Sequence, residues 1–151
     1  MTKTRPLFVL AVSLGAALLF AALVAVTFHG EMQFFLLTYY VPIGVPFVAF
    51  LFDRADRWLE TTWLQRIVDL CVLILALARA VAPVPLISGH TLFLVYALLS
   101  SRSWVVRVTA ALVLLEVIYL KVFVWRDPTL IGGAAAACLA AWVFRRVAHS
   151  S

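Results

Sequence analysis

The sequence predicts an all-α integral membrane protein, a bundle of six transmembrane helices with both termini in the cytoplasm. Of its 151 residues, 66% are apolar and only 13% are charged, and the mean hydropathy is +1.10. A soluble domain is about 45–50% apolar and about 25% charged. Since a span needs roughly 17–25 residues, we expect residues 1–151 to form a single transmembrane domain.

The first two spans are expected over 7–28 and 34–52. The first apolar run is longer than the core of a secretory signal peptide, which is about 7–15 residues. Pro42 and Pro46 lie in the second run. Because proline has no backbone N–H, they predict a kinked or broken helix.

A polar segment over 53–66 follows the second span. Its charged residues and two tryptophans predict an amphipathic helix that lies in the membrane interface. The third span is expected over 67–82. Asp69 follows Arg66 by three residues, which predicts a local ion pair between them.

Three further spans are expected over 90–100, 105–124 and 128–144. Ser88 could cap the first of these, and Asp127 followed by Pro128 is a favourable start for the last. The small residues over 132–137 predict close packing of the last span against a neighbouring span or another subunit.

The basic residues predict the orientation of this bundle. When alternate loops are assigned to opposite sides, nine basic residues lie on one side: Lys3, Arg5, Arg54, Arg57, Arg66, Arg102, Arg107, Arg145 and Arg146. The positive-inside rule makes this side cytoplasmic. The localisation expected is a bacterial inner membrane. No basic patch typical of nucleic-acid binding is present in the sequence, so we expect no nucleic-acid partner.

The candidate site is the stretch from Arg79 to His90, which this topology places on the outer side. Ser88 and Gly89 precede a predicted helix start, where free N–H groups and the helix dipole favour phosphate. His90 could donate a proton, and Arg79 could hold an anionic headgroup through its planar guanidinium. The alternatives are an interfacial histidine beside an ordinary cap and an arginine that reaches outward from a span end.

The span over 105–124 and the turn after it contribute further candidates. Four residues would share one face if the helix stays regular: Glu116, Tyr119, Phe123 and Asp127. A carboxyl group inside the hydrocarbon is costly, so Glu116 is a functional candidate, with a structural hydrogen bond as the alternative. Lys121 and Arg126 could supply supporting cations for the substrate, beside Tyr119. Glu116 and Asp127 could orient them or move protons.

A divalent metal could be bound by His29, Glu31, His90 and Asp127, because imidazole and carboxylate groups are ordinary zinc or iron ligands. None of these residues has the spacing of a ligand pair on one helix. We therefore expect no cofactor, with a metal as the weaker alternative.

The order of these elements resembles the type 2 phosphatidic acid phosphatase superfamily, six-span enzymes that act on lipid phosphates or pyrophosphates at the membrane surface. Its P-S-G-H motif, often followed by threonine, is similar to Ser88-Gly89-His90-Thr91. The segment from Tyr119 to Asp127, before a small-residue-rich last span, is similar to the region of its third motif. The resemblance implies that His90 is the proton donor and that Asp127 orients the nucleophile.

This sequence also departs from the pattern of that superfamily. Phe123 stands where the family has its nucleophilic histidine, Glu116-Val117 replace its S-R pair, and its K-x6-R-P motif has no match near Arg79. Phenylalanine cannot be phosphorylated. The resemblance thus implies a related fold without the usual covalent mechanism.

These patterns predict an outward-facing cationic pocket that engages a phospholipid or a polyprenyl (pyro)phosphate, in a phosphatase-like protein without the usual nucleophile. One alternative is an active lipid-modifying or metal-dependent enzyme, a hydrolase or transferase acting on a lipid phosphate through a rearranged site. The other is a non-catalytic membrane subunit that packs against partner proteins or forms a homo-oligomer.

Overall fold

The computed structural model describes residues 5–81 and 87–149, and within these ranges every regular element is a helix. The all-α prediction is confirmed. The elements in chain order are α1 (Pro6–Thr27), α2 (Gly30–Phe35), the π-helical segment η1 (Leu36–Tyr40), α3 (Val41–Asp56), α4 (Trp63–Val81), α5 (Gly89–Ser100), α6 (Trp104–Tyr119), the π-helical segment η2 (Leu120–Val124) and α7 (Thr129–His149).

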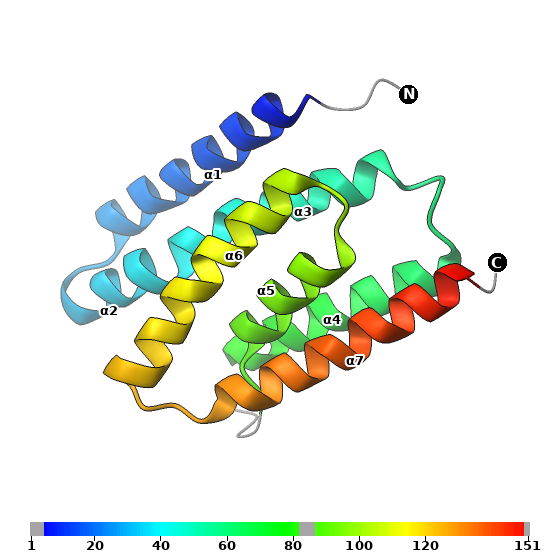
Figure 1. Cartoon of the computed structure of the whole chain (residues 1–151). Coiled ribbons are helices and arrows are strands. Elements are labelled where there is room, and N and C mark those ends of the chain that lie inside the picture. The colour runs from blue at the N-terminus through cyan, green and yellow to red at the C-terminus, as the bar shows by residue number, and fades with distance from the viewer. Residues whose placement is uncertain (1–4, 82–86, 150–151) are drawn as a thin grey trace.

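The long helices lie lengthwise beside one another, and the chain reverses direction between them (Figure 1). Both ends of the described chain therefore lie at the same end of the bundle, together with the ends of α3 and α5 and the starts of α4 and α6. We call this the basic end, since most arginines lie there. The starts of α5 and α7 lie at the opposite end.

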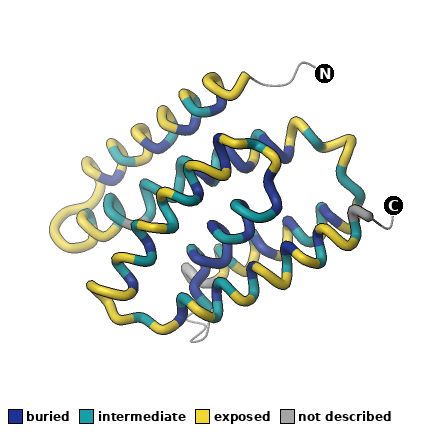
Figure 2. Tube along the Cα trace, in the orientation of Figure 1, coloured by how far each residue is buried: buried dark blue, intermediate teal, exposed yellow. Residues whose placement is uncertain are grey.

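The short helix α5 is the centre of the bundle. It contacts α3, α4, α6 and α7, and eight of its 12 residues are buried, among them Leu92, Leu94 and Tyr96. Figure 2 shows α5 as the most continuously buried helix. In contrast, α1 lies at the edge of the bundle and buries only Val9, Ser13, Ala17 and Val24. Its remaining surface is mostly apolar and exposed.

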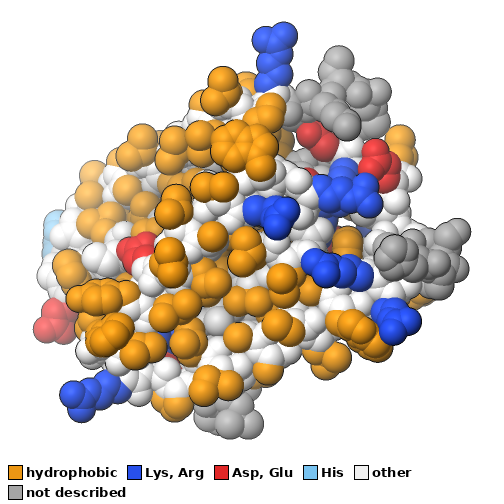
Figure 3. Space-filling model, in the orientation of Figure 1, with side chains coloured by type: hydrophobic (Ala, Val, Ile, Leu, Met, Phe, Trp, Pro, Cys, Tyr) orange, Lys and Arg blue, Asp and Glu red, His pale blue; other side chains and the backbone are white. Residues whose placement is uncertain are grey.

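Among the residues that the structure describes, three helical stretches are long and apolar enough to cross a membrane: Pro6–Thr27, Gly30–Asp56 and Thr129–Val147. Large apolar side chains also cover much of the outside of the molecule (Figure 3). A soluble protein of this size rarely exposes so much continuous apolar surface. The helical composition and this surface are compatible with a membrane protein.

The second stretch is irregular where its prolines predicted a break. The chain passes from α2 into α3 through η1, which ends two residues before Pro42. Pro42 has no N–H to donate to the carbonyl of Thr38, and just before it the Val41 N–H donates to the Leu36 carbonyl, five residues earlier, which is the π-helical pattern. The Thr38 hydroxyl donates instead to the Phe34 carbonyl at 2.8 Å.

The interfacial helix expected over 53–66 does not form. Instead, α3 continues to Asp56, the chain turns, and α4 begins at Trp63. The cause is that Asp53 and Arg54 face inward, each 9% exposed, and belong to the buried end of α3. The start of α4 is stabilised by a reciprocal pair of hydrogen bonds between Thr62 and Gln65, the arrangement of a capping box.

Candidate functional site

The turn into α5 is held from two sides. Ser88 caps the helix as predicted, because its hydroxyl accepts from the Thr91 N–H at 3.3 Å and from the Thr91 hydroxyl at 3.0 Å. The Ser88 N–H donates to the Thr129 carbonyl at 3.1 Å, which ties this turn to the start of α7. The backbone before His90 is thus fixed by two helices.

Gly133 allows α7 to approach this turn. A Cβ atom at Gly133 would lie 2.7 Å from the Ser88 carbonyl oxygen and 3.0 Å from the Thr91 Cβ. Ala137 and Ala141, one and two turns further along α7, are also buried, and α7 packs on α5. The small residues of α7 therefore serve packing within the chain, one of the two outcomes that the sequence predicts.

An ion pair joins η2 to the turn before α7. The Lys121 ammonium group donates to Asp127 Oδ2 and, at 3.2 Å, to the Thr129 hydroxyl. Asp127 Oδ1 accepts from the Thr129 N–H at 2.9 Å, so Asp127 also caps the start of α7 as predicted. The side chain of Lys121 is 5% exposed and that of Asp127 is 26% exposed.

The protonation of Asp127 follows from these contacts. Burial acts against its ionisation, but the hydrogen bonds from Lys121 and Thr129 and the charge of Lys121 outweigh burial. They lower the pKa of Asp127 from 3.8 to about 2. Asp127 is a carboxylate at neutral pH and holds the Lys121 ammonium group in place.

These groups line a polar cavity of about 290 Å³. Its lining contains five of the residues that the sequence singled out, Ser88, Gly89, His90, Lys121 and Asp127, together with Phe35, Tyr40 and Trp125. The His90 ring lies edge-on to Tyr40, with 4.9 Å between ring centroids. The Phe35 ring contacts the rings of Tyr40 and Trp125, with 5.7 and 5.9 Å between ring centroids. The charged groups of this lining, Lys121 and Asp127, neutralise each other.

Sequence reasoning missed the three aromatic residues of this cavity. Phe35 and Tyr40 lie at the start of the second predicted span, and Trp125 lies at the end of the fifth. The predicted topology places both of these span ends at the same side as His90. The position of these aromatic residues at those two span ends could therefore have assigned them to the site.

Other sequence candidates lie away from the cavity. Tyr119 is 59% exposed and contacts Phe123, with 5.5 Å between ring centroids. Glu116 is half-buried and Arg126 is exposed. The shared face expected from Glu116 to Asp127 is interrupted, because η2 follows Tyr119 and Arg126 has a left-handed φ of 50°.

The remaining candidates are the metal ligands and Arg79. His29 and Glu31 are exposed at the start of α2 and do not line the polar cavity. Among the described residues no three His, Cys, Asp or Glu side chains are grouped to hold a metal ion. The Arg79 side chain and residues 82–86 lie outside the described residues.

An apolar cavity of about 300 Å³ adjoins the polar one. It lies among α1, α3, α4 and α5, and is lined mainly by alkyl and aromatic side chains such as Phe20, Ile43, Phe47 and Leu73. Tyr40, Gly89 and His90 line both cavities. The polar and apolar spaces therefore meet at the start of α5.

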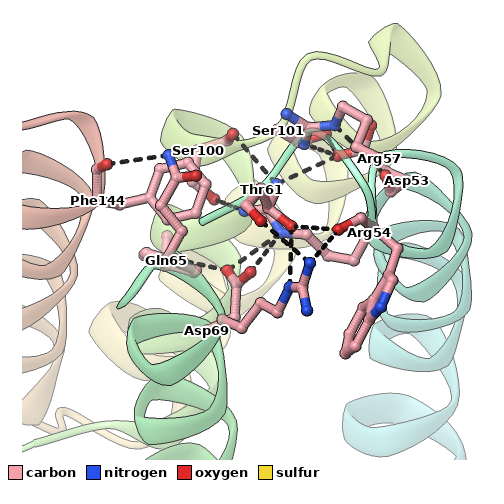
Figure 4. A network of polar contacts seen from close by, with 12 residues as sticks. Asp53, Arg54, Arg57, Thr61, Gln65, Asp69, Ser100, Ser101 and Phe144 are labelled. Atoms are coloured by element: carbon pink, nitrogen blue, oxygen red, sulfur yellow. Dashed lines mark hydrogen bonds and ion pairs between the residues drawn. The ribbon is translucent and has the colours of Figure 1, made fainter. Parts of the chain in front are cut away.

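A second polar cluster lies at the basic end, around Arg54 (Figure 4). Arg54 donates to Asp69 at 3.1 Å and to the Ser100 hydroxyl at 2.7 Å. The Tyr96 hydroxyl also donates to Asp69, at 2.7 Å. The Arg54 guanidinium lies between the rings of Phe50 and Phe144, 4.5 and 4.7 Å from their centroids.

This cluster is balanced in charge. Asp53 accepts hydrogen bonds from Arg57 and, at 2.8 Å, from the Ser101 hydroxyl. The cluster therefore contains two arginines, Arg54 and Arg57, and two aspartates, Asp53 and Asp69. In the described part of the chain, every buried side-chain nitrogen or oxygen has a hydrogen-bond partner. A fully satisfied buried network of this kind specifies how α3, α4 and α5 join.

The prediction of an ion pair between Arg66 and Asp69 is wrong. Asp69 points into the bundle toward Arg54, which is 15 residues earlier on α3. Arg66 turns back over the preceding loop, where it donates to the Thr61 carbonyl at 3.1 Å and stacks on Trp58 at 4.1 Å. Asp69 therefore pairs with Arg54 inside the bundle and not with Arg66, its neighbour in the sequence.

Comparison of the chain with known protein families, characterised proteins and solved structures finds no match. The resemblance to the phosphatase superfamily therefore stays a prediction that rests on Ser88-Gly89-His90-Thr91 and Asp127.

Proposed function

We propose that this chain binds a phosphate-bearing lipid, a phospholipid or a polyprenyl (pyro)phosphate, with its headgroup in the polar cavity and its hydrocarbon chain in the apolar one. The observation that carries the proposal is that Tyr40, Gly89 and His90 line both cavities. A ligand that fills both spaces must be polar at one end and apolar along its length.

Three kinds of donor are available to the phosphate. The first is the Gly89 N–H, which lies at the positive end of the α5 dipole, where an anion is favoured; the Thr91 N–H already donates to the Ser88 hydroxyl. His90 can donate from its imidazole ring, and Lys121 supplies an ammonium group that Asp127 holds toward the cavity. Since Asp127 neutralises Lys121, affinity would come from directed hydrogen bonds more than from net charge.

The proposal includes six membrane spans, with both termini on the cytoplasmic side of a bacterial inner membrane. Its support is the alternation of helix direction in Figure 1 and the exposed apolar side chains on α4 and α6, such as Leu70, Ile74 and Leu112. The arginines at the basic end support the orientation through the positive-inside rule. The polar cavity then faces the outer surface.

The proposal is for binding rather than covalent catalysis. Phe123, which aligns with the nucleophile of the superfamily that the chain resembles, is 71% exposed and is not part of the polar cavity lining. The alternative of a rearranged enzyme makes a separate prediction. Inorganic phosphate should then appear when the protein is incubated with a polyprenyl pyrophosphate.

The test is equilibrium binding of a polyprenyl phosphate to the detergent-solubilised full chain. His90→Ala should weaken binding about tenfold, the effect of one lost charge-assisted hydrogen bond. His29→Ala is the matched control, because His29 directly precedes α2, which starts at the same end of the bundle, and does not line the cavity. Equal binding of the polyprenyl phosphate by the wild type and His90→Ala would count against the proposal.

A further inference from the structure

A large depression at the basic end is unrelated to the lipid site proposed above. It has a volume of about 740 Å³ and is walled by the loop after α3, the end of α5, the start of α6 and the last turns of α7. Its charged lining consists of Arg57, Arg102, Arg107 and Arg145 against Glu60. We call it the arginine basin. Four positive groups against one negative group give this lining a formal charge of +3.

The arginines of the basin differ in how they are held. Arg57 is paired with Asp53 of the Arg54 cluster, so its charge is largely neutralised behind the wall. Arg145 is fixed at the rim by a hydrogen bond of 2.8 Å to the Leu99 carbonyl. Arg102 and Arg107 are exposed, and among the described residues neither forms an ion pair. Within the described ranges, the charges of Arg102 and Arg107 are thus not balanced by an ion pair.

The wall behind these cations is held together by hydrogen bonds. The Ser100 hydroxyl accepts a hydrogen bond from Arg54, and the Ser101 hydroxyl donates one to Asp53 (Figure 4). Gln65 closes the adjoining side with a hydrogen bond of 3.4 Å to the Phe144 carbonyl and with the capping pair to Thr62. A basin with a fixed wall needs little reorganisation to receive an anion.

Tryptophans place the basin at the level of the lipid headgroups. Trp58, Trp63, Trp104 and Trp142 are each more than half exposed, and all lie at the basic end, in the loop after α3, at the starts of α4 and α6 and near the end of α7. Tryptophan is enriched at the membrane–water interface. Figure 3 shows basic side chains gathered at this end of the surface.

We propose that the arginine basin binds the phosphate headgroup of an anionic phospholipid. The uncompensated charge of Arg102, Arg107 and Arg145 favours an anion, and the guanidinium fork matches phosphate oxygens. The flanking tryptophans favour a lipid over a soluble phosphate compound, because they hold the basin where headgroups lie. This site is at the opposite end of the bundle from the polar cavity and does not depend on it.

The test is native mass spectrometry of the full chain in detergent, titrated with phosphatidylglycerol or with zwitterionic phosphatidylcholine. The wild type should bind phosphatidylglycerol more tightly. The double variant Arg102→Gln/Arg107→Gln should weaken that binding about 30-fold, from the attraction typical of two basic residues at an anionic surface. The double variant Arg102→Lys/Arg107→Lys, which keeps both charges, should retain most of the affinity.

A matched control removes two charges from the same end but outside the basin. Arg5→Gln/Arg146→Gln should bind phosphatidylglycerol as the wild type does, because neither residue lines the basin. His90→Ala should also leave this binding unchanged, which separates the result from the test of the polar cavity. Helical content from circular dichroism confirms that each variant is folded.

Three results would overturn the proposal. An equal loss in the control pair would show that general surface charge attracts the lipid. Equal affinity of the wild type for phosphatidylcholine would show that the phosphate charge is not recognised. Competition by soluble glycerophosphoglycerol at the same concentration as phosphatidylglycerol would make the basin a site for soluble phosphate compounds.

Discussion

The close approach of α7 to the start of α5 makes a strong prediction about Gly133. In Gly133→Ala, the new Cβ atom would lie 2.7 Å from the Ser88 carbonyl oxygen, 3.0 Å from the Thr91 Cβ and 3.2 Å from the Ser88 nitrogen. Two of these three neighbours are backbone atoms, so the clash cannot be relieved by turning a flexible side chain. The helices must separate, and the turn before His90 must move.

The magnitude follows from comparison with a second glycine. Gly15→Ala places a Cβ in open space, with nothing within 4 Å. Both variants gain the same helix propensity of alanine over glycine, about 1 kcal/mol. The difference between them isolates the clash, and overpacking of a close interface costs about 1–3 kcal/mol. Gly133→Ala should therefore be less stable than Gly15→Ala by that amount.

The assay is reversible unfolding of both variants in detergent, with lipid binding measured in parallel. Gly133→Ala should also bind the polyprenyl phosphate more weakly, since Ser88 and Gly89 line the polar cavity. If Gly133→Ala and Gly15→Ala have equal stability, α7 does not approach α5 as closely as described, and the reasoning is refuted.

Three further predictions concern the polar groups. Lys121→Met should destabilise the protein by about 1–3 kcal/mol because it leaves Asp127 without its cation. The double variant Lys121→Met/Asp127→Asn should recover part of this loss. If the effects of the two substitutions on stability are additive, the two side chains are not paired. Tyr96→Phe should cost about 1–2 kcal/mol of unfolding free energy through the lost hydrogen bond to Asp69, and an unchanged denaturation midpoint would argue against that bond. Folding lowers the pKa of Asp127 from 3.8 to about 2, so its carboxylate stabilises the fold above about pH 4, and this contribution is lost as the pH falls toward 2. Asp127→Asn should lose less stability than the wild type over that pH range, and identical pH profiles would rule out the contribution.

Much of the fold could be read from local patterns in the sequence. The apolar runs predicted the helices. The cap at Ser88 was predictable too, because its partner Thr91 is only three residues away in the sequence. The irregular second stretch followed from Pro42, since the missing N–H is a property of that residue alone.

The Arg54 cluster could not be predicted in this way. It joins Arg54 to Asp69 and Ser100, which are 15 and 46 residues away. These partners meet only because α3, α4 and α5 pack with a particular rotation about their axes. Periodicity places Asp69 near Arg66 in sequence, but it does not show which way the carboxylate faces once the helices pack.

The candidate site was partly predictable for the same reason. Topology alone brought His90, Lys121 and Asp127 to one end of the bundle, and the polar cavity contains all three. The π-helical segment η2 interrupts the face from Glu116 to Asp127, and a regular helix was the only basis for expecting Glu116 and Tyr119 beside them.

The central claim is that one amphiphilic ligand occupies both cavities, and photo-crosslinking tests it most directly. A polyprenyl phosphate with a photoreactive group on its hydrocarbon chain should label residues of the apolar cavity, such as Ile43 or Phe47, and excess unlabelled polyprenyl phosphate should suppress this labelling. The matching polyprenol, which lacks the phosphate, should compete much less. Labelling spread over exposed side chains such as Leu19 and Leu139, or equal competition by the polyprenol, would contradict the account.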